Sequence, residues 1–265
     1  MSAKKLLLAL SVIWMMAGQL EAQQQPVYYQ TLNCIKVMPG KGREFSQFIN
    51  DTIKKVAQTR ADAGEILSWT FLRSVMPQGQ EARCDYMIST IAEGAPRAPI
   101  GREGFEKALQ KAGVSMPVSD WYAKRDSLSS LVSTEMWRPR IRLGAPQKDH
   151  YLFLNYMKVH DAPEYIDFEN NVWRPMAEEW VKEGSQSGWV FATKVLPSGT
   201  DTTYAAYSAD IYPSWDAAFK QRSVRTTFDK IHSGKNFQQT MDRLPKLRDL
   251  ARRELWVVVE RVAKK

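Results

Sequence analysis

The chain has 265 residues, with 37 Lys and Arg against 29 Asp and Glu and a formal net charge of +8 at pH 7. The basic residues are spread over the sequence and mixed with acidic ones. We therefore expect a solvated basic surface and no nucleic-acid partner, which would need a basic stripe with interleaved aromatic residues. Two cysteines without a nearby histidine cluster predict no metal site.

The first segment predicts export. Two lysines precede an apolar run over residues 6–17, which is too short to span a bilayer and is followed by the small residue Ala22. We expect a signal peptide over residues 1–22 and a mature protein in the periplasm or outside the cell, without a stable membrane anchor. An uncleaved anchor is the alternative.

The next segment begins an alternation of strands and helices. Alternating β-forming residues predict a strand over 28–38, which Pro39 and Gly40 end. Apolar residues at helical spacing predict a helix over 43–61, which Gly64 ends. The remaining expected elements of this half are strands over 66–75, 84–91 and 133–138, and helices over 103–111 and 118–131.

The second half repeats this order. A strand is expected over 151–159, followed by a helix over 163–182 that Gly184 ends. The remaining expected elements are strands over 189–196, 202–211 and 255–262, and helices over 214–231 and 237–252.

Short sequence matches show that the two halves are an internal repeat. The offset between matched positions drifts only from 122 to 119 residues. The matches are Leu32-Asn33-x-x-Lys36-Val37 with Leu154-Asn155-x-x-Lys158-Val159, Trp69-x-Phe71 with Trp189-x-Phe191, and Glu135-x-Trp137 with Glu254-x-Trp256. We predict two homologous units, over residues 23–140 and 141–265.

The order βαββαβ, present twice, predicts an α+β fold of two tandem ferredoxin-like units, each an antiparallel sheet with helices on one face. Strands such as 189–196 are apolar on both sides, so the second sheet face must also be covered. Packing one sheet against the other forms an intramolecular α/β barrel. We therefore expect a monomer with an internal pseudo-two-fold axis.

Two local patterns add a family resemblance. Asn33 precedes the turn at Pro39-Gly40, and Ser214-Trp215-Asp216-Ala217-Ala218-Phe219 precedes a predicted helix. Both resemble segments of the dimeric α/β-barrel superfamily, which includes antibiotic-biosynthesis-type monooxygenases and haem-degrading monooxygenases. The resemblance implies the barrel fold and a pocket with a strand asparagine.

The haem-degrading members of that superfamily also use a helix histidine as iron ligand. The three histidines here are His150, His160 and His232, and none occupies such a position in the expected elements. The resemblance therefore implies no haem, and we expect no cofactor.

Six residues are candidate ligand-binding residues. Asn33 and Asn155 lie in mid-strand, where each amide either points into the barrel cavity to orient a ligand or makes a structural hydrogen bond. Trp69 and Trp189 either line an aromatic pocket or belong to the core. Arg73, on the face of Trp69, either binds an anion or is an arginine exposed to water.

Tyr86 is the sixth candidate. Its phenol, like that of Tyr204, either donates a proton into a cavity or packs with its hydroxyl in water. Glu135 and Glu254 either act as general bases inside the barrel or lie at strand ends, facing solvent or in ion pairs.

Cys34 and Cys84 lie on strands expected to be neighbours, and an exported protein could keep a disulfide between them. A disulfide requires Cα atoms within about 7 Å, so free thiols remain the alternative.

No G-x-S-x-G, H-E-x-x-H or Gly-rich phosphate-binding loop is present, so the sequence identifies no catalytic residue. We expect an exported protein that binds a small apolar or aromatic molecule in a cavity between sheet and helices. One alternative is a cofactor-independent monooxygenase-like enzyme, and another is a structural or interaction protein whose barrel is filled by side chains.

Overall fold

The structure is a computed structural model that describes residues 26–94, 98 and 100–264. The predicted signal peptide, residues 1–22, lies outside the described residues, so that assignment stays a prediction. None of the helices within the described ranges is both long and apolar enough to cross a bilayer.

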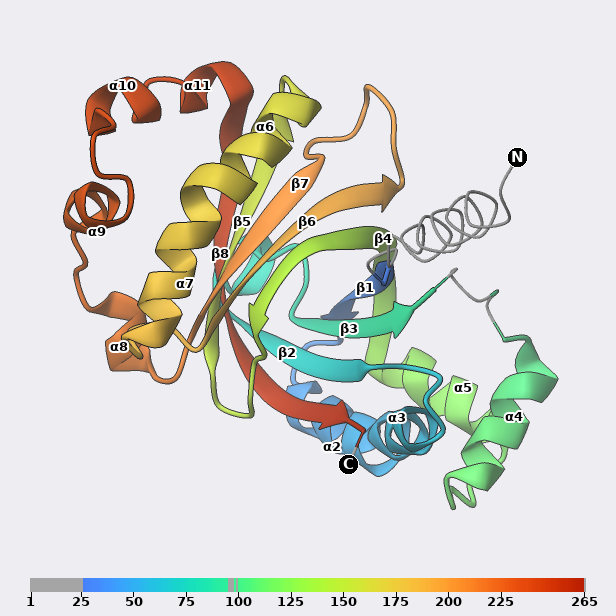
Figure 1. The fold of residues 1–265 in the computed structure, drawn as a ribbon. Coiled ribbons are helices and arrows are strands. Elements are labelled where there is room, and N and C mark those ends of the chain that lie inside the picture. The colour runs from blue at the N-terminus through green and yellow to red at the C-terminus, as the bar shows by residue number, and fades with distance from the viewer. Residues whose placement is uncertain (1–25, 95–97, 99, 265) are drawn as a thin grey trace, which may run out of the picture.

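Each unit contributes four strands and a set of covering helices (Figure 1). The strands are β1 (Tyr28–Val37), β2 (Ser68–Met76), β3 (Tyr86–Glu93) and β4 (Ser129–Gly144) in the first unit, and β5 (Tyr151–Val159), β6 (Gly188–Leu196), β7 (Ala206–Tyr212) and β8 (Arg248–Ala263) in the second.

The helices follow the same repeat. The first unit has α2 (Gly42–Asp51), α3 (Ile53–Asp62), α4 (Arg102–Lys111) and α5 (Val118–Leu128), with a 3₁₀ turn η1 (Gly79–Glu81). The second has α6 (Ala162–Phe168), a π-helical turn η2 (Glu169–Trp173), α7 (Arg174–Lys182), α8 (Trp215–Phe219), α9 (Val224–Ile231), α10 (Phe237–Met241) and α11 (Leu244–Leu247).

The eight strands close into one antiparallel barrel in the order β1-β3-β2-β8-β5-β7-β6-β4. The long strands β4 and β8 close it, because each pairs with its own unit along one half and with the other unit along the other half. β4 pairs with β1 and then β6, and β8 pairs with β5 and then β2. The predicted fold, two ferredoxin-like units in an intramolecular α/β barrel, is confirmed.

The same two strands explain two of the differences between the expected and the observed elements. The helices expected over 118–131 and 237–252 stop early, because β4 begins at Ser129 and β8 at Arg248. These strand beginnings are held by pairing with β1 and β5, a long-range contact that overrides a local helical pattern. The unit boundary predicted at residue 140 falls inside β4, and residues 145–150 link the units.

Both long strands also carry a β-bulge at the equivalent place. The register of β4 against β6 shifts between Pro139 and Ile141, leaving Arg140 as the extra residue. In β8 the partner of Phe71 is Glu260 and the partner of Leu72 is Val258, which leaves Val259 extra. A bulge reverses the inward and outward alternation of the residues that follow it.

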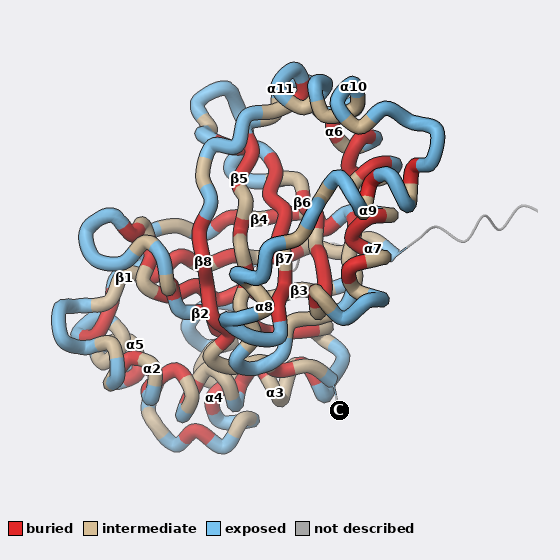
Figure 2. Tube along the Cα trace, turned by 90° about the vertical axis from the view of Figure 1, so that its left-hand side faces the viewer, coloured by how far each residue is buried: buried red, intermediate tan, exposed pale blue. Residues whose placement is uncertain are grey.

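The strands have one face toward the helices and one toward the barrel interior. The outward faces pack on the helices in two clusters, one per unit, which include Phe71 and Phe191. A third cluster fills the barrel and includes Trp137 and Trp256. Figure 2 shows buried positions along the strands and exposed ones on the outer loops.

Cys34 of β1 and Cys84, just before β3, form a disulfide with their Cα atoms 5.3 Å apart. Both side chains belong to the cluster inside the barrel. The structure therefore has the disulfide and not the alternative of two free thiols.

Candidate functional site

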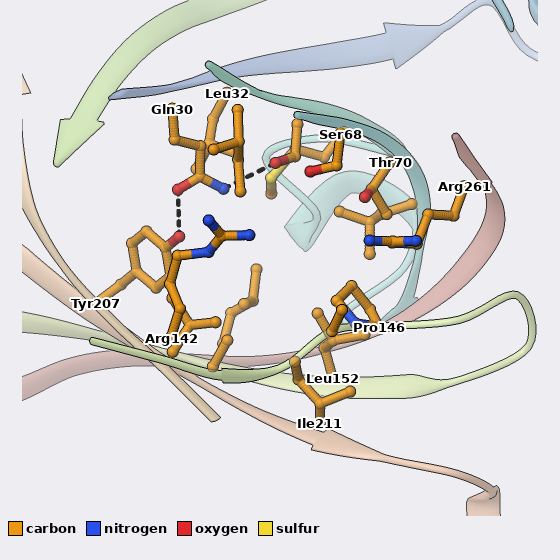
Figure 3. A pocket seen from close by; sticks show the side chains of 18 of the residues that line it. Gln30, Leu32, Ser68, Thr70, Arg142, Pro146, Leu152, Tyr207, Ile211 and Arg261 are labelled. Atoms are coloured by element: carbon orange, nitrogen blue, oxygen red, sulfur yellow. Dashed lines mark hydrogen bonds between the residues drawn. The ribbon is translucent and has the colours of Figure 1, made fainter. Parts of the chain in front are cut away.

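The barrel interior holds a cavity of about 70 Å³ near the link between the units (Figure 3). Its lining comes from inward-facing residues of the strands and from Gly144, Ala145 and Pro146. The polar side chains that line it are Gln30, Ser68, Thr70, Ser89, Tyr156, Tyr207, Arg142 and Arg261. The Tyr156 hydroxyl is buried and makes no hydrogen bond within the described ranges.

Arg142 of β4 and Arg261 of β8 occupy equivalent positions of the repeat and line the same cavity. Arg142 is the cross-strand partner of Val190, and Arg261 is the partner of Thr70. The two bulges bring both arginines to the inside, because residues 142 and 261 follow the bulged residues.

The two guanidinium groups have no counter-charge in the cavity. Its lining contains no carboxylate from the part of the chain that the structure describes. Burial, and then the nearby guanidinium of Arg142, lower the pKa of Arg261. The Arg261 Nε is buried and makes no hydrogen bond within the described ranges. Arg142 lies over the ring of Tyr28, with 5.0 Å from its Cζ to the ring centroid.

The polar groups beside the arginines fall into two sets. Gln30 is already bonded: its Nε2 donates to Ser89 Oγ at 2.8 Å, and its Oε1 accepts from the Tyr207 hydroxyl. Ser68 and Thr70 are each 6% exposed, and their hydroxyls make no side-chain hydrogen bond with another described residue. These two hydroxyls are therefore open to a molecule in the cavity.

Farther along the barrel a buried network surrounds Glu135. Its Oε1 accepts from the Tyr204 hydroxyl at 2.9 Å and from Lys194 and Arg83 at 3.3 Å each, and its Oε2 accepts from Trp137 Nε1 at 3.2 Å. Burial lowers the pKa of Lys194, although Glu135 opposes this shift. Glu135 is thus an ion-paired group that fills this part of the barrel.

The equivalent Glu254 repeats the local arrangement. Its Oε2 accepts from Trp256 Nε1 at 3.0 Å, and its Oε1 pairs with Arg252. The repeated Glu-x-Trp pattern therefore has a structural explanation, since each carboxylate satisfies the indole N–H two residues along its own strand. Of the two roles considered for these glutamates, ion pairing is the one that the structure has.

The two candidate asparagines lie on the outward faces of their strands. Leu32 and Cys34 take the inward positions around Asn33, and Leu154 and Tyr156 take those around Asn155. Neither amide points into the barrel, which is the arrangement of the second alternative, a structural hydrogen bond.

Both asparagine amides have protein partners. Asn33 Oδ1 accepts from Thr134 Oγ1 at 2.8 Å. Asn155 Nδ2 donates to Ser208 Oγ at 3.2 Å and to Asp210 Oδ2 at 2.9 Å. These are structural hydrogen bonds on the helix side of the sheet.

Trp69 and Trp189 also lie on the outward faces, stacked on their neighbours. The ring centroids of Trp69 and Phe71 are 6.0 Å apart, and those of Trp189 and Phe191 are 6.5 Å apart. Both tryptophans belong to the clusters beneath the helices and do not line the barrel cavity.

Arg73 and Tyr86 are the two candidates that the structure brings together. They share an open groove of about 480 Å³ on the outside of the first unit, together with Arg43 and Asn50. Burial raises the pKa of Tyr86, whose hydroxyl donates to the Gly42 carbonyl at 3.2 Å. Arg73 is exposed. None of the other four candidates lines this groove.

Sequence reasoning missed the residues of the barrel cavity. A signal for the arginines is present, because Glu135-x-Trp137 and Glu254-x-Trp256 are each followed by an arginine at the same spacing, Arg142 and Arg261. No comparable signal marks Ser68 or Thr70, because their equivalents in the second unit are Gly188 and Val190.

No family model matches the chain, and no curated protein matches it. Among solved structures, a candidate monooxygenase from Fusobacterium nucleatum subsp. nucleatum ATCC 25586 is similar, with a TM-score of 0.52 at 12% identity over 91% of this chain and 96% of that chain.

Two further structures are similar at the same level of identity. A candidate monooxygenase from Lactobacillus acidophilus NCFM has a TM-score of 0.49 at 11% identity, over 90% of this chain and 96% of that chain. An anthrone oxidase-like protein has a TM-score of 0.49 at 11% identity, over 91% of this chain and 94% of that chain. At such identities the likeness concerns the fold: the chain has the dimeric α/β-barrel architecture, with both units in one polypeptide.

Proposed function

We propose that the protein binds a small anionic molecule inside its barrel, held by Arg142 and Arg261. The observation that supports this most is the pair of repeat-related arginines at one cavity whose described lining has no carboxylate. Both arginines are half-buried, and a cation that loses part of its hydration without gaining a partner is destabilising. An oxyanion removes that destabilisation, because a guanidinium donates two parallel hydrogen bonds to it.

The size of the cavity limits the ligand. A buried water needs about 10–15 Å³ of such volume, so a cavity of about 70 Å³ suits a molecule of roughly five to seven non-hydrogen atoms. This volume and the two positive charges favour a small anion over the small apolar or aromatic molecule that the sequence suggests. The proposed site also lies inside the barrel, whereas the sequence suggests a site between sheet and helices.

The proposal predicts that anion binding depends on both arginines. We expect Arg142→Gln and Arg261→Gln each to weaken binding of acetate, propionate, sulfate or phosphate at least about tenfold, because each removes charge-assisted hydrogen bonds of about 1.5–3 kcal/mol. The double variant should bind none of them. Isothermal titration calorimetry at constant ionic strength measures this.

The matched control is Arg140→Gln, which removes the same charge from an exposed position on the same strand. It should bind as the wild type does. The proposal would be contradicted if the double variant bound these anions as tightly as the wild type does. It would also be contradicted if the wild type bound none of them. In the latter case the structural or interaction role with a filled barrel becomes the better explanation.

A second candidate function is a cofactor-independent monooxygenase-like activity. It is supported by the outer groove that Arg73 and Tyr86 share, and the Fusobacterium protein of the same fold is described as a candidate monooxygenase. Oxygen uptake with aromatic substrates that is lost in Tyr86→Phe and retained in Arg142→Gln would favour this activity over the barrel site.

We also propose that the mature protein is exported and monomeric. The basic and apolar leader supports export, as does the disulfide, which persists in oxidising compartments. Closure of the barrel within one chain pairs both edges of each described strand, so none of these strands needs a second copy. Intact-mass analysis from the host should find an oxidised chain beginning near Gln23, and light scattering should find single chains. A full-length reduced chain or a dimer would contradict this.

A further inference from the structure

At four pairs of equivalent positions the cavity has a polar wall in the first unit and an apolar wall in the second. At two other positions the second unit is the more polar, with Tyr207 in place of Met87 and Tyr156 in place of Cys34. Strand pairing aligns the two walls, because Thr70 pairs with Ser89 in the first unit as Val190 pairs with Ala209 in the second. The four equivalent pairs, with the first unit named first, are Gln30 and Leu152, Ser68 and Gly188, Thr70 and Val190, and Ser89 and Ala209.

The polar wall offers hydrogen bonds next to a positive charge. Thr70 is the cross-strand partner of Arg261, and the hydroxyls of Ser68 and Thr70 have no partner among the described residues. In Figure 3 both side chains lie on the same side of the cavity as Arg261. Two hydroxyls and a guanidinium thus form a donor group suited to the oxygen atoms of an anion.

The apolar wall offers no donor at Leu152, Val190 and Ile211, although Arg142, Tyr156 and Tyr207 lie beside it. Leu152, Val190 and Ile211 present only carbon atoms to the cavity. A tetrahedral sulfate or phosphate has oxygen atoms on all sides, and those that faced this wall would lose water without gaining a hydrogen bond. A carboxylate with an aliphatic chain has all its charge at one end and apolar surface at the other.

We infer that the ligand is an aliphatic monocarboxylate of about three to five carbons, which corresponds to the five to seven non-hydrogen atoms that the cavity accommodates. Its carboxylate binds Arg142 and Arg261 and the free hydroxyls, and its chain lies against the wall of the second unit. This inference rests on the proposed function and adds the chemical class of the ligand.

The first test is a titration of the wild-type chain with acetate, propionate, butyrate, valerate and octanoate, and with sulfate and phosphate, at constant ionic strength. Each buried CH₂ should raise the affinity about fourfold. The rise should stop once the cavity is full, so octanoate should bind less tightly than valerate. Sulfate and phosphate should bind at least about tenfold more weakly than butyrate, because of their unsatisfied oxygens.

The second test exchanges residues between the walls. Val190→Thr introduces the residue that the first unit has at position 70, and we expect it to weaken butyrate binding at least about fivefold while strengthening sulfate binding relative to butyrate. Thr70→Val is the converse control and should weaken every carboxylate. Thermal unfolding of both variants checks that they fold. If either variant does not fold, the chain-length series on the wild type tests the carboxylate inference instead.

The outcomes separate the two proposals. Sulfate or phosphate binding as tightly as butyrate, still dependent on Arg142 and Arg261, would overturn the carboxylate inference and leave the anion site standing. Carboxylate affinity that does not change with chain length would also overturn the carboxylate inference and leave the anion site standing. If neither carboxylates nor inorganic anions bind the wild type, both proposals fail.

Discussion

Replacing Glu169 by glutamine should stabilise the protein at pH 9 by about 2–4 kcal/mol and have little effect below pH 4.5. Glu169 begins the π-helical turn η2, between α6 and α7, and is 3% exposed. The equivalent residue of the first unit is Ile49, a core residue of α2. A carboxyl group thus occupies a buried position whose equivalent in the first unit holds an aliphatic side chain.

Burial raises the pKa of Glu169 to about 8. Tyr165 and Arg248 oppose this shift, and Asp210 reinforces it. The folded protein therefore keeps Glu169 protonated at neutral pH, whereas the unfolded chain releases the proton above its ordinary pKa of 4.5. The stability that the neutral form contributes is complete below pH 4.5 and is lost as the pH rises toward 8.

Glutamine resembles the protonated acid and does not titrate, so the variant should keep this contribution to stability as the pH rises. Urea unfolding of wild type and Glu169→Gln between pH 4 and pH 9 measures the difference, which should widen as the pH rises. Glu178→Gln, on the exposed side of α7 and paired with Arg174, is the control and should follow the wild type. Parallel curves for wild type and Glu169→Gln would contradict a raised pKa.

Removing the disulfide should lower the melting temperature by about 5–15 °C. Cys34 and Cys84 are 50 residues apart, and closing a loop of that length in the unfolded chain corresponds to about 4 kcal/mol in the chain-entropy account. The equivalent positions of the second unit hold Tyr156 and Tyr204, whose ring centroids are 4.7 Å apart. The barrel is thus cross-linked on one side and packed with aromatic rings on the other.

The double variant Cys34→Ala/Cys84→Ala tests this by circular dichroism. A reducing agent should lower the melting temperature of the wild type to a similar extent and leave the double variant unchanged. The prediction would be contradicted if the wild type kept its melting temperature after its thiols had been shown to be reduced.

Much of the fold could be predicted because the repeat and the alternation of apolar residues are local signals. The strand over 151–159, for example, is found with those bounds. The ends of the helices before β4 and β8 could not be placed, because what holds Ser129 and Arg248 in strands is pairing with distant partners. Local pattern carries no information about such contacts.

The cavity was missed for a more specific reason. Simple alternation from the inward Trp137 would place Ile141 inside the barrel and Arg142 outside. The bulge at Arg140 reverses this order, so Arg142 faces the cavity and Ile141 packs beneath the helices. The same holds for Arg261 after the bulge at Val259. A one-residue irregularity of pairing thus decides which side chains form the site.

The covalent link between the units has a consequence for what the barrel can recognise. In a barrel made of two identical chains, every residue on one side of the axis has its copy on the other, so a cavity on the axis has matching walls. Here each half is encoded separately, and Thr70 can face the same space as Val190. Because both halves belong to one polypeptide, the central cavity need not be symmetric. It can therefore bind the two ends of a ligand with different side chains.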